Sequence, residues 1–598
     1  MGIKSRTVLA ALGIVASASA VVSTSSLPSS QTACVDSSET YDAVESLMNV
    51  YCRGPLLDAV QHAELFNDSK YFVDMPIKSN SSAVQILAEF ERDVLPSLPS
   101  LTNATLEPTL RAFVTRHFDE PGSELRKIVL SDFSETVVPP RIASIKNEVY
   151  RTWAMGLHSL WKELGRSPSR DVISSYLHPT PLASLGDSDA STVIVVPGGR
   201  FRESYYWDSY WIIEGLLVSN MKDTARRVVR NLLEYVGQYG FVPNGGRIYY
   251  LTRSQPPMLS DMVRLVATKG NASTQQAKVE WDIEYLRAVV PLLEKEYTFW
   301  MTSHAVEVTK NGATYKLNHY TAGANAPRPE SYREDVRLAE TAFPKNQDRQ
   351  NEFYDDIIAA AESGWDFSSR WFRDHETLAT IVTRDVVPVD LNVIMHRVES
   401  NLATFYEALG DISAAKRFQD AAVTRSRAID AVFWDEKSSS WRDYYLSSGS
   451  LSPVVAVSNY SPLWGRAFAN DDRDRLDRVV SSLRTSGLIQ VAGVQTTTKL
   501  TGEQWDAPNA WPPLQDILIE GLLSVKTKEA DDLATELVRT WVQTSLAAWN
   551  STGLMFEKYN TTVVGGLGTG GEYTPQFGFG WTNGVILKFL TSFQEILP

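Results

Sequence analysis

The chain has 598 residues, of which 43% are hydrophobic and 21% charged, and both proportions are ordinary for a globular protein. Its net charge of −14 argues against nucleic acid or an anionic membrane as a partner, because either would require a basic face. Sixteen Trp and twenty-four Tyr suit stacking on sugar rings, but aromatic residues are also ordinary core material, so composition leaves the function open.

The first twenty residues have the pattern of a secretory signal. Lys4 and Arg6 precede an apolar run from Val8 to Ala16, and Ala18-Ser19-Ala20 fits a small-residue cleavage site. The run is short for a membrane span, although retention as an anchor is the alternative. The C-terminus lacks the apolar tail of a lipid-anchor signal, so we expect residues 1–20 to be removed and the protein to be secreted, extracellular and without a stable membrane anchor.

Two further features agree with export. Cys34 and Cys52 are the only cysteines, and a disulfide between them is favoured over two free thiols. Asn-x-Ser/Thr sequences predict N-glycans in a eukaryotic host. These acceptor sequences begin at Asn67, Asn80, Asn103, Asn271, Asn459, Asn550 and Asn560.

Helical spacing dominates the chain after a Ser/Thr-rich segment, residues 21–40, that we expect to be flexible. Apolar residues between 283 and 300 recur at alternating steps of three and four, which marks one buried helix face. The same pattern over 391–409 stops at Gly410, and a new helix follows at once to Trp434. Two helices joined by so short a link predict an antiparallel αα-hairpin.

Similar helix pairs are predicted at 209–219 with 222–238 and at 513–523 with 528–549. The length would allow about four domains of ordinary size, but no linker is evident after residue 40. No exact repeat is visible either, which argues against a regular solenoid. We therefore expect one all-α domain over 41–598, a toroid of helix hairpins with its functional loops at one end.

Five Trp-Asp pairs stand out, at 207–208, 281–282, 365–366, 434–435 and 505–506. Those at 281 and 434 lie within predicted helices and are expected to be structural. The other three adjoin Gly or Pro where loops lead into helices. An Asp there serves equally well as a helix cap or as a functional carboxylate, so each pair alone leaves both interpretations open.

Arginines accumulate in the Gly/Pro-rich loops between helices. A single Arg is more often a surface charge or part of a structural ion pair, but Arg beside aromatic and carboxylate residues in several loops favours gripping of hydroxyls. The loop arginines are Arg200, Arg202, Arg247, Arg253, Arg328 and Arg333.

Carboxylates are the remaining candidates for acid and base chemistry. The histidines lack zinc-ligand spacing, and neither a calcium loop, a G-x-S-x-G elbow nor a P-loop occurs, so we expect no metal and no cofactor. Two carboxyl groups flanking a glycosidic bond are what glycoside hydrolysis requires.

Two long segments resemble the signature motifs of the trehalase family, the inverting α,α-trehalose hydrolases. They are PGGRFRESYYWDSY at 197–210 and QWDAPNAWPP at 504–513. The resemblance extends over roughly residues 45–590. Further similar segments are 51–76, 243–257, 328–335, 362–371 and 556–559.

The resemblance implies an (α/α)6 toroid, with trehalose as the small-molecule substrate. It also implies Asp366 as the general acid and Glu557 as the general base. An inverting pair should lie about 6.5–9.5 Å apart and release one α- and one β-glucose. Asp366 should be kept protonated by apolar or anionic surroundings, including Trp365, whereas nearby arginines should keep Glu557 ionised. The other residues implied to bind substrate are Arg200, Tyr205, Trp207, Asp208, Asn244, Arg253, Gln255, Arg328, Glu330, Gly364, Trp505 and Glu572.

The chain departs from the family pattern at two places. Gly568-Thr569-Gly570-Gly571 replaces a run of four glycines, which affects a predicted lid. Asn560 replaces a common Asp and creates a glycan acceptor three residues from Glu557. A glycan there would crowd the mouth of the site, so we expect Asn560 to be unmodified.

Two alternatives to a trehalose hydrolase remain compatible with the sequence. One is another toroidal carbohydrate enzyme, such as an α-glucosidase or a glycoside phosphorylase, which activity on maltose but not trehalose would favour. The other is a sugar-binding protein without turnover. The presence of both Asp366 and Glu557 argues against a pure binder, which needs neither.

Overall fold

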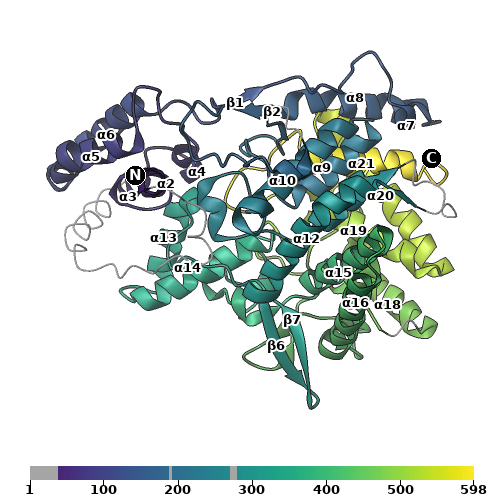
Figure 1. Cartoon of the computed structure of the whole chain (residues 1–598). Coiled ribbons are helices and arrows are strands. Elements are labelled where there is room, and N and C mark those ends of the chain that lie inside the picture. Colours follow the sequence, from purple (N-terminus) through teal and green to yellow (C-terminus); the bar gives the residue numbers. More distant parts are fainter. Residues whose placement is uncertain (1–37, 187–191, 270–278, 470–471, 598) are drawn as a thin grey trace.

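The computed structural model describes residues 38–186, 192–269, 279–469 and 472–597 (Figure 1). The predicted signal peptide, nearly all of the predicted flexible segment and Cys34 lie outside these residues. The first described helix is α2 (Ser38–Tyr51). Within the described part of the chain, no helix is both long and apolar enough to cross a bilayer.

Six helices of the described chain form a closed inner ring, in which each helix contacts the next and the last contacts the first. In ring order they are α9 (Asp208–Val218), α11 (Leu259–Ala267), α15 (Val389–Leu409), α17 (Ser461–Gly465), α19 (Pro512–Val525) and α21 (Gly580–Ser592). Their order around the ring is also their order along the chain.

Six outer helices alternate with the inner helices along the chain, and most of them pack against the inner ring. They are α8 (Glu148–Leu164), α10 (Lys222–Tyr239), α12 (Ile283–Ser303), α16 (Ile412–Phe433), α18 (Arg473–Thr485) and α20 (Lys528–Thr552). Six inner and six outer helices within the described residues make the (α/α)6 toroid that was predicted. The predicted hairpins are confirmed as α9–α10, α15–α16 and α19–α20, with Gly410 in the left-handed conformation that ends α15.

The ring closes where α9 crosses α21, and two glycines permit this contact. A Cβ added at Gly584 of α21 would lie 1.9 Å from the carbonyl oxygen of Trp211 in α9. A Cβ added at Gly215 of α9 would lie 2.7 Å from the Cα of Gly584. The two helix backbones therefore touch, and no side chain fits between them.

We expect Gly584→Ala to lower the free energy of unfolding by about 3 kcal/mol, because the added methyl group forces the two helices apart. Urea or thermal unfolding measures the loss, and Ser481→Ala on an exposed face of α18 is the control. A stability within about 0.5 kcal/mol of wild type would show that the crossing yields easily.

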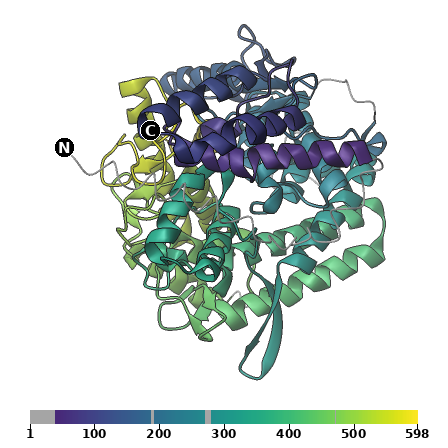
Figure 2. The same ribbon diagram turned by 90° about the vertical axis from the view of Figure 1, so that its left-hand side faces the viewer.

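Further helices precede the toroid in the chain or are inserted between two of its helices. Figure 2 shows the N-terminal helices as a layer across one side of the ring. They are α2, α3 (Pro55–His62), α4 (Ser69–Val73), α5 (Ala83–Glu89) and α6 (Asn103–His117), followed by α7 (Pro140–Ala143). Two more, α13 (Tyr332–Ala342) and α14 (Gln347–Glu362), stand between α12 and α15.

The strands are short and connect helices. The longest pair is the antiparallel hairpin β6 (Ala305–Lys310) with β7 (Ala313–Asn318), which projects from the body in Figure 1. A three-stranded sheet joins β1 (Leu125–Lys127), β2 (Gly165–Pro168) and β3 (Ile194–Val195). One pair matters for the site, because β15 (Asn509–Ala510) and β16 (Tyr559–Asn560) join two distant loops. The other pairs and triplets are β4 (Thr268–Lys269) with β5 (Glu280–Trp281), β9 (Trp434–Asp435) with β10 (Ser440–Trp441), β13 (Ile489–Gln490) with β14 (Gly493–Val494), and β8 (Val386–Val387) with β11 (Tyr444–Tyr445) and β12 (Ser450–Leu451).

Two of the Trp-Asp pairs differ from the prediction in their local structure. Trp281 and Trp434 were placed inside helices, but each lies in a two-residue strand at a helix end. The Asp282 side chain caps α12 by accepting a hydrogen bond from the Tyr285 N–H. The apolar spacing of the sequence does not mark where these helices begin or end. The structural role expected for Asp282 agrees with its capping of α12.

Candidate active site

A pocket with a volume of about 80 Å³ lies at the N-terminal ends of three inner helices, α9, α19 and α21. All fourteen residues implied to catalyse or bind substrate line it, from segments spread between residues 200 and 572. Eight further residues complete the lining: Phe201, Tyr250, Ser331, Ala361, Trp511, Tyr573, Phe579 and Trp581. A wider cleft of about 680 Å³ shares Arg200, Glu330, Ser331, Glu572 and Tyr573 with the pocket, and therefore adjoins it.

Helix starts bring several of these side chains to the pocket. Trp207 is the N-cap of α9 and Asp208 its first residue, while Trp511 and Phe579 are the N-caps of α19 and α21. Pro512 and Pro513 favour the start of α19, because the first turn of a helix needs no backbone donor there. The positive ends of these helix dipoles point toward the pocket and favour negative charge in it.

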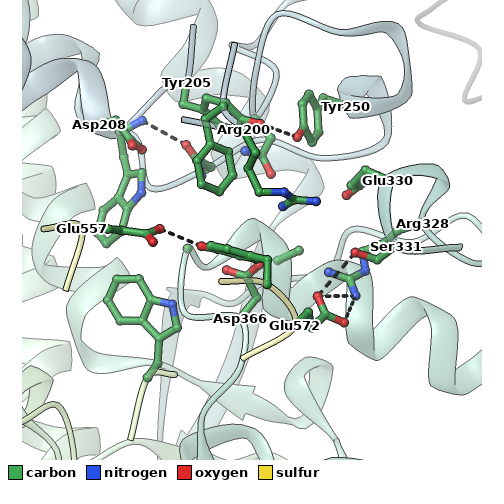
Figure 3. Close-up of a pocket in the computed structure, with 18 of the residues that line it drawn as sticks. Arg200, Tyr205, Asp208, Tyr250, Arg328, Glu330, Ser331, Asp366, Glu557 and Glu572 are labelled. Atoms are coloured by element: carbon green, nitrogen blue, oxygen red, sulfur yellow. Dashed lines mark hydrogen bonds and ion pairs between the residues drawn. The ribbon is translucent and has the colours of Figure 1, made fainter. Parts of the chain in front are cut away.

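Asp366 lies in the loop that follows α14 and faces the pocket (Figure 3). Loss of solvent raises its pKa to about 7, with a further rise from Glu572, while Arg328 acts in the opposite direction. Gly364 makes the loop possible, since it has a φ of +74° and a Cβ there would lie 2.9 Å from the Trp207 ring. The chain thus holds a carboxyl group that is protonated near neutral pH.

Trp365 does not line the pocket with its neighbour Asp366. Its ring stacks on Trp505 with centroids 5.5 Å apart, and the Arg370 guanidinium lies 4.7 Å from its centroid. The pKa of Asp366 is therefore raised by the enclosure as a whole and by Glu572.

Glu557 is buried, with 1% of its surface exposed, and its carboxylate accepts two hydrogen bonds. The Tyr573 hydroxyl donates one at 2.7 Å, and the Gln576 backbone N–H donates the other at 3.1 Å. Burial raises the pKa of Glu557, whereas Lys558, these hydrogen bonds and Arg200 lower it. Figure 3 shows Glu557 and Asp366 reaching the same pocket from different segments.

Asp208 is one of three further carboxyl groups that line the pocket, with Glu330 and Glu572. Burial raises its pKa to about 8, and the charges of Glu557 and Asp366 add to the rise. Near neutral pH this group carries a proton that it can donate to a hydroxyl oxygen.

Three arginines line the pocket, and each is held by carboxylates. Arg253 donates to the Asn244 side-chain oxygen and to Glu330, both at 2.6 Å. Arg328 donates to Asp335 at 2.6 Å and to Glu572 at 2.9 Å. The donors left over on fixed guanidinium groups suit recognition of sugar hydroxyls.

The third pocket arginine, Arg200, is held from outside the toroid. It makes two hydrogen bonds with Asp68, at 2.8 and 2.7 Å, and Asp68 is the N-cap of α4 in the N-terminal helices. Its guanidinium carbon also lies 4.7 Å from the centroid of the Tyr573 ring. The N-terminal helices therefore orient one wall of the pocket.

The remaining loop arginines lie outside the pocket lining. Arg247 is fully buried behind it, where it pairs with Glu124 at 2.6 Å. Arg202 lies 3.9 Å from Asp74, and Arg333 contacts Glu334 and backbone carbonyls of the N-terminal segment. These three carry out structural ion pairing.

Asp506, the Asp of the third Trp-Asp pair in a loop, is also structural. It is fully buried and accepts hydrogen bonds from the Ser369 N–H and from the hydroxyls of Thr497 and Thr501. Its neighbour Trp505 lines the pocket, whereas Asp506 itself does not.

Sequence reasoning missed several aromatic residues of the pocket. Tyr573 follows Glu572 directly, and Tyr250 and Phe201 lie within the resembling segments, so their positions were a usable signal. Aromatic residues are also common in cores, and the sequence alone did not separate the two uses.

Comparison with known proteins identifies the family of the chain. Residues 64–594 match the trehalase family. The chain is 38% identical to a trehalase of Pimpla hypochondriaca over 555 residues, covering 92% of this chain and 90% of that protein. It is also 38% identical to a human trehalase over 553 residues, covering 92% and 90%. The solved structure of neutral trehalase from Saccharomyces cerevisiae is similar with a TM-score of 0.54 and 25% identity, covering 69% of this chain and 76% of that one.

Proposed function

Because the chain belongs to the trehalase family, we propose that it hydrolyses α,α-trehalose to two glucose molecules by an inverting mechanism. One observation carries the mechanistic part. Two carboxyl groups from distant segments face one pocket, and the pKa of one of them, Asp366, is raised to about 7, so that it is protonated in the range where acid catalysis is needed. The other, Glu557, is held by Tyr573 and the Gln576 N–H, which fixes its orientation.

In the proposed reaction, Asp366 gives its proton to the bridging oxygen while the bond from that oxygen to the anomeric carbon breaks. Glu557 takes a proton from a water molecule whose oxygen bonds to the same carbon from the opposite face. The sugar that is attacked leaves as β-glucose and the other as α-glucose. Asp366 ends ionised and Glu557 protonated, and exchange of one proton with solvent restores both groups.

The other lining residues are assigned to recognition. Protonated Asp208 and the guanidinium groups of Arg253 and Arg328 offer hydrogen-bond donors to sugar hydroxyls, and Glu330 accepts. The ring of Trp505 is stacked on that of Trp511, with centroids 3.8 Å apart, and forms part of the apolar wall. The aromatic walls remove water from the pocket, which strengthens each of these polar interactions.

Incubation of the protein with trehalose, followed by NMR of the anomeric protons, tests the proposal. We expect equal initial amounts of α- and β-glucose, before mutarotation mixes them. Two equivalents of α-glucose would contradict inversion. Turnover of maltose with none of trehalose would replace the proposed substrate with that of an α-glucosidase.

The same assignments predict the pH dependence of kcat/KM. Asp366 works protonated, so activity falls as the pH rises through its pKa of about 7. Glu557 works ionised, so activity falls as the pH drops through its pKa, which burial raises above its ordinary value. We expect a bell-shaped profile with its maximum below about pH 7, measured in buffers of constant ionic strength. A plateau extending to pH 9 would contradict the role of Asp366.

We propose further that the protein is secreted and carries N-glycans on some of its acceptor sequences, consistent with the signal-like first twenty residues. The disulfide between Cys34 and Cys52 stays a prediction, because Cys34 lies outside the described residues.

Two acceptor sequences should stay unmodified. Asn459 is 1% exposed and its side-chain oxygen accepts from the Ala456 N–H, so a glycan there is incompatible with the fold. Asn560 lies in β16 beside the pocket, and its side chain is engaged with Thr562. Glycopeptide mass spectrometry of active protein from a eukaryotic host should find both asparagines bare, and high occupancy of either would contradict this.

A further inference from the structure

Lys558 follows the proposed base directly but does not line the pocket. Its ammonium group is fully buried and donates two hydrogen bonds, to the Gln504 side-chain oxygen at 2.7 Å and to the Gly570 carbonyl at 2.9 Å. It also lies 5.3 Å from the centroid of the Trp511 ring and 5.7 Å from that of Tyr573. A buried cation with these specific partners costs desolvation free energy, and the proposed mechanism gives it no task.

Gln504 continues the chain of contacts toward the proposed acid. Its side-chain NH2 group donates a hydrogen bond to the Asp366 carbonyl oxygen at 2.5 Å. Its side-chain oxygen accepts a hydrogen bond from the Lys558 ammonium group. Each end of one amide therefore holds one catalytic segment. The path from the Asp366 backbone to the residue beside Glu557 contains two hydrogen bonds and two side chains.

The hydrogen bonds that join Asp366, Gln504 and Lys558 are called the bridge below. The glycine-rich loop, residues 565–571, is attached to this bridge. The Gly568 N–H donates to the Lys558 carbonyl, and Asn509 exchanges hydrogen bonds with the backbone of Thr569 at 2.7 and 3.0 Å. The strands β15 and β16 pair Asn509 with Asn560, so the loop, the base segment and the second signature motif form one unit. This loop leads directly to Glu572 and Tyr573, which line the pocket.

Glycine is required where the loop meets the bridge. A Cβ at Gly571 would lie 2.7 Å from the Gln504 side-chain oxygen, and a Cβ at Gly568 would lie 2.7 Å from the Lys558 side chain. Thr569, the one residue that departs from the family's glycines, is exposed and contributes only backbone contacts to Asn509. The departure therefore leaves the bridge intact.

We propose that Lys558 and Gln504 are positioning residues that set the proposed acid and base relative to each other and hold the glycine-rich loop against them. This inference rests on the proposed function, because the pair it positions is Asp366 and Glu557. Lys558 also supplies positive charge close to both carboxyl groups, and Gln504 does not. Replacement of Lys558 and replacement of Gln504 should therefore affect the pH dependence of kcat/KM differently.

The charged groups around Glu557 determine the pH at which the acid limb of the kcat/KM profile lies. Lys558 and Arg200 lower its pKa, as does the Tyr573 hydrogen bond, while Asp208 and Asp366 are the nearby acids. Removal of the Lys558 charge should therefore move the acid limb of the kcat/KM profile to higher pH. Removal of the Gln504 amide should leave that limb in place.

The experiment compares Lys558→Met, Lys558→Arg and Gln504→Leu in the full-length protein, with Lys416→Met on the exposed face of α16 as the matched control. We expect Lys558→Met and Gln504→Leu each to lower kcat on trehalose about 100-fold with KM within about fivefold of wild type, in the range that misplacement of catalytic groups causes. Lys558→Arg should keep the acid limb at its wild-type pH. The double variant should lose less than the product of the single losses, because both act through one hydrogen bond.

Thermal unfolding separates positioning from folding. Wild-type kcat together with an unshifted acid limb in Lys558→Met, with only a lowered Tm, would overturn the proposal. So would fully multiplicative losses in the double variant. A failure of the proposed function would appear differently, as a wild-type protein that does not turn over trehalose or as active Asp366→Asn and Glu557→Gln variants.

Discussion

Replacement of Asp366 with Asn is expected to lower kcat on trehalose about 1,000-fold, within the range that a positioned proton donor contributes. Asn has the same shape and, like the protonated acid, no charge. The pKa of Asp366 is raised to about 7, so below that pH the variant leaves the charge of the pocket unchanged. We therefore expect KM to stay within about threefold of wild type, and the loss to fall on kcat.

The role of Asp366 as an acid has a sharper test in the leaving group. α-Glucosyl fluoride releases fluoride, which needs no proton from the enzyme. If the wild-type enzyme accepts this substrate, Asp366→Asn should retain activity on it within about tenfold. The exposed Asp420→Asn on α16 serves as the matched control and should match wild type on both substrates. Equal losses on trehalose and on the fluoride would show that Asp366 does not act by proton donation.

The helix hairpins of the toroid could be predicted because helical spacing is a local property of the sequence. The closure of the ring could not be predicted, because it depends on residues that are distant in the chain. The apolar period of α15 and the stop at Gly410 depend on neighbouring residues in the sequence. The crossing of α9 and α21 depends on Gly215 and Gly584, which are far apart in the chain. A glycine that permits a helix contact has no local pattern that distinguishes it from a glycine in a flexible loop.

The candidate site was anticipated mainly through the resemblance to a family, and the residues alone were ambiguous. Arg247 and Arg253 occur in the same Gly-rich segment, yet Arg253 lines the pocket and Arg247 is buried behind it against Glu124. The partner that decides between them comes from the N-terminal part of the chain, so no local signal separates a gripping arginine from a structural one. The same holds for Asp208 and Asp506, whose roles depend on which hydroxyls and backbone groups surround them.

Replacement of Glu557 with Gln is expected to lower kcat on trehalose about 1,000-fold or more, because no other ionised carboxylate is assigned to take the proton from water. In contrast to Asp366→Asn, this variant should lose its activity on α-glucosyl fluoride as well, since attack by water is needed whatever the leaving group. The Gln576 N–H can still donate to the amide oxygen, and the Tyr573 hydroxyl can turn to accept from the amide NH2, so the fold should keep its Tm within a few degrees.

A smaller variant, Glu557→Ala, separates the base from a merely structural carboxylate. Azide carries its own negative charge and needs no base, and removal of the side chain leaves room for it beside the anomeric carbon. Because Asp366 still protonates the leaving oxygen, added azide should restore cleavage of trehalose and yield β-glucosyl azide, which NMR identifies by its anomeric coupling. An α-glucosyl azide would contradict attack from the opposite face. A variant that azide does not rescue, but that keeps wild-type Tm and KM, would place the base elsewhere. Glu572 and Glu330, which also line the pocket, would then be the carboxyl groups to replace next, because the pKa of Asp208 is raised to about 8 and keeps that group protonated near neutral pH.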